Sequence, residues 1–147
     1  MLKIPSKTRY KKMHRHILRE FRLKTSKMFN NTVKLFAIQK GYLTVNQILL
    51  FRIFLRKNLR KRVKIGIPLL VNYQTTQKGL GMRMGKGKGK PRDWFIGITY
   101  GSVLFELISN KKSFRKMQDL LKFVQKKLPI YTKIKAYEKN LQKDYTN

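Results

Sequence analysis

The sequence lacks cysteine and contains very little acid. Of its 147 residues none is Cys and only 6 are Asp or Glu. The absence of Cys excludes a disulfide scaffold, a Cys-ligated zinc site and thiol catalysis. The acidic residues are Glu20, Asp93, Glu106, Asp119, Glu138 and Asp144. Because hydrolytic chemistry usually draws on paired carboxylates or a carboxylate-bound metal, so scattered a set predicts that the protein is not an enzyme and has no cofactor.

Long apolar runs are also missing. The most apolar stretch, residues 48–55, is interrupted by Arg52 and is shorter than the roughly 18 apolar residues that a membrane-spanning helix needs. We therefore expect no membrane partner. We expect no small-molecule substrate either.

Positive charge is what the sequence has in excess. The chain carries 36 Lys and Arg residues and a formal net charge of +30. Such a charge repels itself unless a polyanion neutralises it, so composition predicts a nucleic-acid partner. Hydrophobic residues make up 41% of the chain and aromatic residues 12%. This is enough for one modest core, which indicates a single domain with arms rather than a wholly disordered basic tail.

The charge and hydrophobic patterns divide the chain into three parts. Residues 1–27 hold ten basic residues and one acid, and form a basic N-terminal arm or, on composition alone, a mitochondrial transit peptide. We expect residues 28–136 to form one RNA-binding domain with a long loop over 73–94. Residues 137–147 are a polar tail.

Residue patterns within the domain predict an α+β fold, with two amphipathic helices packed on an antiparallel or mixed sheet. The predicted strands are residues 32–39, 63–71 and 130–135, together with a hairpin over 95–107 that turns at Gly101-Ser102. The predicted helices are residues 45–61, with a capping box between Thr44 and Gln47, and residues 114–128, ended by Pro129.

The first of these helices has two faces. Its expected apolar face consists of Ile48, Leu50, Phe51, Phe54, Leu55 and Leu59. Arg52, Arg56 and Arg60 recur every four residues and form a basic stripe. The stripe is either solvated surface or an RNA contact, and we favour RNA because no acidic partner lies one turn away on the helix.

The segment Gly81-Met82-Arg83-Met84-Gly85-Lys86-Gly87-Lys88-Gly89-Lys90-Pro91-Arg92 is the most informative part of the sequence. It fails as a P-loop, because Lys86 is followed by Gly87 and not by Ser or Thr, and as a dinucleotide fingerprint, because no suitable helix follows. A flexible linker is conceivable, but Met-Arg-Met and Asp-Trp-Phe flank the segment. Alternating Gly and Lys instead favours a loop that enters folded RNA.

At these residues the sequence resembles a known family. Residues 83–89 followed by an aromatic strand, with Ser6-Lys7-Thr8-Arg9-Tyr10-Lys11-Lys12-Met13-His14 near the start, are similar to the L-sixteen family of large-subunit ribosomal proteins. Residues 41–48, 103–106 and 127–130 extend the resemblance. It covers residues 3–136 in collinear order.

The resemblance implies an α+β protein at the base of the central protuberance of the large subunit. Such a protein binds large-subunit rRNA, enters late in assembly and helps to position tRNA in the aminoacyl and peptidyl sites. It also implies ribosomal protein neighbours. The implied rRNA contacts are Arg9, Lys11, Lys12, His14 and Arg15 in the arm, to which the basic stripe adds Arg52, Arg56 and Arg60. The implied loop near the peptidyl-transferase region comprises Arg83, Met84, Gly85, Lys86, Gly87, Lys88 and Gly89.

Composition and the resemblance together bear on location. Lys exceeds Arg, and Ala occurs only at Ala37 and Ala136, as expected for an AT-rich genome such as a mitochondrial one. Because the resemblance starts at the beginning of the chain, we expect the arm to remain in the mature protein, in the mitochondrial matrix and encoded in the organelle, with the bacterial cytoplasm as second choice. The alternative function is an organellar nucleic-acid-binding protein or RNA chaperone outside the ribosome.

Three further residue types have competing interpretations. His14 and His16 form an isolated pair without Cys, so we expect no metal and assign His14 to RNA. Trp94 either stacks on a base or, as we prefer, packs at the sheet edge. Met82 and Met84 flank Arg83 and lie against either bases or protein, and the sequence does not decide between these.

Overall fold

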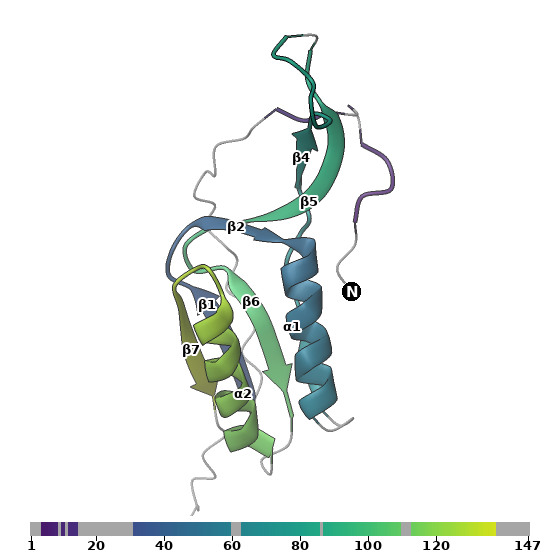
Figure 1. Ribbon diagram of the computed structural model, residues 1–147. Helices are drawn as coiled ribbons and strands as arrows, with labels where there is room; N and C mark the ends of the chain where they lie inside the picture. The colour runs from purple at the N-terminus through teal and green to yellow at the C-terminus, as the bar shows by residue number, and fades with distance from the viewer. Residues whose placement is uncertain are drawn as a thin grey trace, which may run out of the picture.

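The chain folds into two antiparallel sheets and two helices. The computed structural model describes residues 4–8, 10, 12–14, 31–59, 63–85, 87–109 and 113–137. Its elements are β1 Thr32–Ala37, β2 Gly41–Thr44, α1 Val45–Asn58, β3 Lys64–Gly66, β4 Tyr73–Gln77, β5 Lys90–Ile98, β6 Val103–Ile108, α2 Phe114–Lys127 and β7 Thr132–Tyr137. The sheets are ordered β3-β6-β1-β7 and β2-β5-β4, one beyond the other along the molecule (Figure 1). The predicted α+β class is confirmed.

A bent two-stranded ribbon joins the sheets. β1 and β2 follow each other in sequence, and they pair with β6 and β5 respectively, so both strands of the ribbon pass from one sheet to the other. At the bend the Ala37 amide donates to the Ser102 carbonyl and the Gly101 amide donates to the Ala37 carbonyl, both at 2.9 Å. Gly101 has a φ of 77°, which favours glycine. This bend fixes the second sheet relative to the first.

The bend also corrects the predicted hairpin over 95–107. The turn at Gly101-Ser102 exists, but β5 and β6 lie in different sheets and do not pair with each other. Sequence alternation cannot distinguish these cases, because each strand needs only one apolar face whichever neighbour it pairs with. The sequence does not predict strand β2, Gly41–Thr44, because four residues are too few to show a clear alternation of apolar and polar residues.

One apolar core underlies both sheets. It includes Leu35 and Phe105 from the four-stranded sheet and Ile96 from the three-stranded sheet, all fully buried. α2 packs on β1 and β7, whereas α1 packs on β2 and β5. The two helices therefore cover different sheets, where the sequence predicted one. Neither helix of the described residues is long and apolar enough to cross a membrane.

Both helices begin and end close to the predicted positions. The Thr44 hydroxyl accepts from the Gln47 amide at 3.1 Å while the Gln47 side chain accepts from the Thr44 amide at 3.0 Å, which confirms the capping box. α1 ends at Asn58, and residues 60–62 lie outside the described part. Leu50 was wrongly placed in the core and is 65% exposed, because it points about 200° around the helix from Ile48. Along α2 the apolar residues Phe114, Met117, Leu121 and Val124 are buried, and Leu120 is half-buried, as expected for an amphipathic helix.

The other strand limits differ from those predicted. Of residues 63–71 only Lys64–Gly66 form a strand, since Pro68 and the chain beyond it leave the sheet. The last strand is Thr132–Tyr137 rather than 130–135. Ile130 is buried in the core ahead of that strand.

The predicted loop over 73–94 is a hairpin for most of its length. β4 pairs with β5 from Tyr73↔Phe95 to Gln77↔Lys90, whereas β2 reaches only Phe95 on the other side of β5. The outer hairpin is thus a two-stranded ribbon that projects beyond the sheet (Figure 1). Its outermost residues, 74–77 on β4 and 90–93 on β5, include only Pro91 as an apolar residue, and 90–93 are all exposed, so this part of the hairpin shows no alternation of apolar residues. Pro91 is tolerated there, because one edge of β5 needs no donor.

A buried ion pair lies inside the four-stranded sheet. Lys34 of β1 and Glu106 of β6 are directly opposite, and the Lys34 Nζ lies 2.8 Å from the Glu106 Oε1. The Lys34 side chain is only 1% exposed and that of Glu106 is 16% exposed. A buried ammonium that loses its counter-charge destabilises a fold, so Glu106 stabilises the sheet as long as Lys34 lies opposite it.

Glu106→Gln is expected to lower the free energy of unfolding by about 3 kcal/mol, because the Lys34 ammonium stays buried without its counter-charge. Urea unfolding measures the loss. Asp119→Asn is the matched control: Asp119 pairs with Lys122 at 3.3 Å, but both side chains are more than half exposed. We expect its effect to stay within about 0.5 kcal/mol. Equal effects of the two substitutions would contradict the prediction.

Candidate nucleic-acid interface

The loop between β4 and β5 spans residues 78–89, and its described residues, 78–85 and 87–89, follow a defined path. The Lys78 ammonium donates to the Gly85 carbonyl at 2.6 Å across the loop, and the Met82 amide donates to the Gly79 carbonyl at 3.3 Å. Gly81, Gly85 and Gly87 have φ values of 80°, 92° and 81°. Residues with a side chain rarely adopt this left-handed backbone conformation. Glycine at these three positions therefore allows the loop to follow its path.

Gly89 is required for a different reason. A Cβ on Gly89 would lie 2.5 Å from the carbonyl carbon and oxygen of Gln77 and 2.7 Å from the Lys78 nitrogen. The two backbones touch here, at the point where the hairpin opens into the loop. Only glycine allows that approach.

Part of the N-terminal arm is held against the loop by reciprocal bonds. The Lys12 ammonium donates to the Lys88 carbonyl at 2.6 Å, and the Lys88 ammonium donates to the Met13 carbonyl. Two segments 76 positions apart in sequence are thereby brought together. Arm and loop form one surface.

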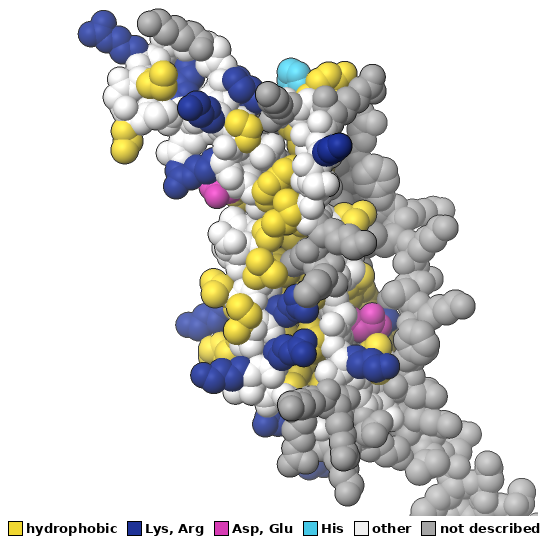
Figure 2. Space-filling model, turned by 90° about the vertical axis from the view of Figure 1, so that its right-hand side faces the viewer, with side chains coloured by type: hydrophobic (Ala, Val, Ile, Leu, Met, Phe, Trp, Pro, Cys, Tyr) yellow, Lys and Arg dark blue, Asp and Glu magenta, His cyan; other side chains and the backbone are white. Residues whose placement is uncertain are grey.

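That surface encloses a cavity of about 870 Å³, which we call the cationic cup. Its cationic lining residues are Lys12, Lys78, Arg83, Lys88 and Lys90. No acidic residue is among the described residues that line it. Cations gathered in a concave site without counter-charges create a strong positive potential, which attracts phosphates. Figure 2 shows dark-blue Lys and Arg side chains gathered around the loop end at the top of the molecule.

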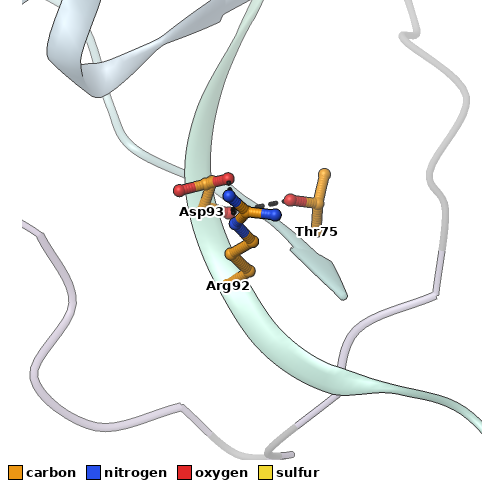
Figure 3. Close-up of polar contacts among 3 residues, drawn as sticks. All are labelled: Thr75, Arg92 and Asp93. Atoms are coloured by element: carbon orange, nitrogen blue, oxygen red, sulfur yellow. Dashed lines mark hydrogen bonds and ion pairs between the residues drawn. The ribbon is translucent and has the colours of Figure 1, made fainter. Parts of the chain in front are cut away.

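The nearest acid in the sequence lies at the base of the hairpin and not in the cup. Between Trp94 and Pro91, β5 advances one residue more than β4 does, which is a β-bulge. Here the Thr75 hydroxyl donates to the Asp93 carbonyl at 3.3 Å, and the Asp93 carboxylate lies 3.5 Å from the Arg92 Nε (Figure 3). Asp93 is therefore partly compensated by its neighbour, and the cup keeps its positive charge.

A second cavity of about 430 Å³ adjoins the first. Its walls are the arm residues Met13 and His14 and the outer face of the three-stranded sheet, and Lys88 lines both cavities. The sheet contributes three aromatic rings: Tyr42, Tyr73 and Phe95. We call this space the aromatic cavity.

The predicted site residues do not all meet. Lys12, Arg83, Met84, Gly85, Gly87, Lys88 and Gly89 line the cup, and His14 lines the aromatic cavity. Arg52 and Arg56 lie on α1, which runs away from the loop (Figure 1). Arg56 is exposed and Arg52 half-buried. Outside the described residues are Arg9, Lys11, Arg15, Arg60 and Lys86.

Several lining residues were not predicted as site residues. Lys78 and Lys90 flank the glycine-lysine run and lie within the loop predicted over 73–94, so the sequence could have indicated both. The three aromatic rings gave none, because Tyr42, Tyr73 and Phe95 look like ordinary strand residues until the register of the sheet is known.

The open alternatives for Trp94 and the methionines are partly decided. Trp94 is half-buried and packs against the core as preferred, although from β5, the central strand of its sheet, and not from an edge strand. Met84 is fully exposed and Met82 65% exposed. Among the described residues no cluster of His, Asp and Glu could hold a metal ion.

Comparison with known proteins gives consistent matches over nearly the whole chain. Residues 5–135 match the family model described as ribosomal protein L16p/L10e. "Large ribosomal subunit protein uL16" of Phytoplasma mali is 32% identical over 132 residues, which is 89% of this chain and 94% of that protein. "Large ribosomal subunit protein uL16c" of Oedogonium cardiacum is 34% identical over 132 residues, 88% of this chain and 93% of that protein.

Gly89→Ala is expected to destabilise the hairpin by about 1 to 3 kcal/mol, because the added methyl group overlaps the backbone of Gln77 and Lys78. Urea unfolding measures the change, and amide exchange over residues 73–98 locates it.

The matched control is Gly79→Ala in the same loop. Its Cβ would lie 3.6 Å from the Met82 Sδ, an ordinary contact. We expect a change within about 0.5 kcal/mol. A destabilisation as large as that of Gly89→Ala would show that loss of any loop glycine is harmful, and that the close approach at Gly89 is not the cause.

Proposed function

The chain belongs to the ribosomal protein L16p/L10e family, and from this membership we propose that the cationic cup holds the phosphate backbone of folded RNA and helps to position tRNA. As a member the chain is a structural constituent of the large ribosomal subunit and not an enzyme. Its partners in that role are rRNA and neighbouring ribosomal proteins.

The cup is the observation that carries the proposal. Five cationic side chains from the arm, the loop and the start of β5 line one concavity, with no acid among the described lining residues. The phosphates of RNA supply the negative charge that the cup lacks. Each phosphate that a cation neutralises also releases a condensed counterion, which favours binding. The cup recognises backbone and shape rather than sequence, as expected for contacts to folded RNA.

The position of the loop supports the finer role. The two-stranded part of the hairpin carries the loop away from both sheets (Figure 1), so its tip can enter a partner that the body of the protein cannot. Arg83 and Met84 are exposed near this tip. We assign the tip to tRNA near the peptidyl-transferase centre, and the arm and the α1 arginines to rRNA. A part in late subunit assembly belongs to the same proposal.

Location and domain organisation stay proposals. The mitochondrial matrix is supported by the lysine-rich, alanine-poor composition, while the relatives named above come from both uL16 and uL16c groups. The division into an arm over 1–27, a domain over 28–136 and a tail over 137–147 is supported by the charge pattern.

Replacing Arg83 and Lys90 together by Gln is expected to weaken RNA binding and to reduce the slope of log K against log salt by about one per cation removed. Filter binding of the full chain to large-subunit rRNA across a salt series measures both quantities. These exposed side chains can be changed without touching the core.

The control removes equal charge elsewhere. Lys126 and Lys127 are exposed in the last turn of α2. Replacing both by Gln lowers net charge by the same amount outside the cup. A salt slope reduced equally by the two double variants would mean that net charge, and not the cup, governs binding.

Large subunits that carry Arg83→Gln with Lys86→Gln are expected to bind peptidyl-site tRNA about 10-fold more weakly, through loss of charge-assisted contacts. Sedimentation of the same subunits tests assembly separately. Unchanged tRNA binding in fully assembled subunits would refute the role of the tip. A wild-type chain that leaves large subunits in high-salt gradients would favour the alternative of an RNA chaperone outside the ribosome.

A further inference from the structure

The aromatic cavity has no part in the function proposed above. Tyr42 lies opposite Gly97 and Tyr73 lies opposite Phe95 in the register of β5. Residues 95 and 97 face away from the core, while Ile96 and Ile98 are fully buried on the other face. The three rings therefore share the outer face of the sheet. Because Gly97 has no side chain, nothing stands between Tyr42 and Tyr73 across the central strand.

The geometry of the rings suits a planar ligand. The centroids of Tyr42 and Tyr73 lie 5.5 Å apart, and the ring planes meet at 84°. Two nearly perpendicular rings form a corner, in which a flat group can stack on one ring and contact the other by its edge. The cavity volume of about 430 Å³ falls in the range of small-ligand sites.

Polar groups stand where the edge of such a ligand would reach. β4 is one of the two edge strands of its sheet, and Gln74, Thr75 and Thr76 line the cavity beside the rings. An amide and hydroxyl groups both donate and accept hydrogen bonds, as the edge of a nucleobase requires. His14 adds a further ring from the arm.

The shared cation decides the chemical class of the ligand. Lys88 lines both the aromatic cavity and the cationic cup, so a ring site and a phosphate site lie within one side chain of each other. A nucleotide joins a planar base to a phosphate over that length. We propose that the aromatic cavity receives a single unpaired RNA base, splayed out of its helix, while the phosphates beside it lie in the cup.

This inference rests on the proposed function, since the cup must hold the RNA for the base to enter. It adds a distinct property: preference for RNA with an unpaired base at the right place. Stacking on an aromatic side chain tolerates every base, so the preference should be for the presence of a base rather than for its identity.

The test uses the full chain and two RNA hairpins that differ at one bulged nucleotide. One hairpin carries a fluorescent purine analogue in the bulge, and the other an abasic residue. Wild-type protein is expected to bind the first about 10-fold more tightly and to quench its fluorescence by stacking. Tyr73→Leu should abolish this preference and the quenching while leaving the salt slope unchanged, and Tyr73→Phe should retain both.

Controls keep the outcome interpretable. Tyr131→Leu removes an aromatic ring that is 77% exposed and outside the cavity, and it should behave as wild type. If Tyr73→Leu does not fold, Tyr42→Leu takes its place. Equal wild-type affinity for the two hairpins, or a preference that survives loss of the ring, would overturn the inference. Failure of the proposed function has another signature, namely a salt slope unchanged by loss of Arg83 and Lys90.

Discussion

The excess of positive charge that the chain cannot neutralise by itself is the constraint on which the structure depends. With 36 cations and 6 acids, each described carboxylate has a local partner: Glu106 pairs with the buried Lys34, Asp93 with Arg92 and Asp119 with Lys122. Of these three pairs only Lys34–Glu106 is buried, and there the Glu106 carboxylate compensates a lysine inside the sheet. None of these acids lines the cationic cup, so the charge there remains available to a polyanion.

The fold converts that charge into a projecting surface. The bent ribbon of β1-β2 and β6-β5 carries the chain from the four-stranded sheet to the three-stranded sheet, and the β4-β5 hairpin continues beyond the end of β2. Hydrogen bonds between Lys12, Lys88 and Met13 then bring the arm to the loop. Cup and aromatic cavity arise at this junction, so neither belongs to a single sequence segment.

Much of the local structure could be predicted because its causes are local. The capping box at Thr44, the apolar spacing of α2 and the strand at β1 depend on neighbours a few residues away. The outer hairpin could not be predicted, because residues 74–77 and the exposed start of β5, residues 90–93, lack the apolar alternation that marks a strand in the sequence. The expected hairpin over 95–107 failed because the choice of partner strand depends on contacts distant in sequence.

From residues alone this protein is predicted to bind a polyanion and to lack hydrolytic chemistry, and its glycine-lysine loop carries the motifs of a ribosomal protein family. These follow from composition and residue order, which need no coordinates. Which residues meet depends on the folded chain: Lys12 joins the loop, Arg52 and Arg56 lie on α1 away from it, and Tyr42 and Tyr73 face each other across β5. The register of the strands and the bend between the sheets determine which side chains come into contact. Both arise from pairings between residues far apart in the chain.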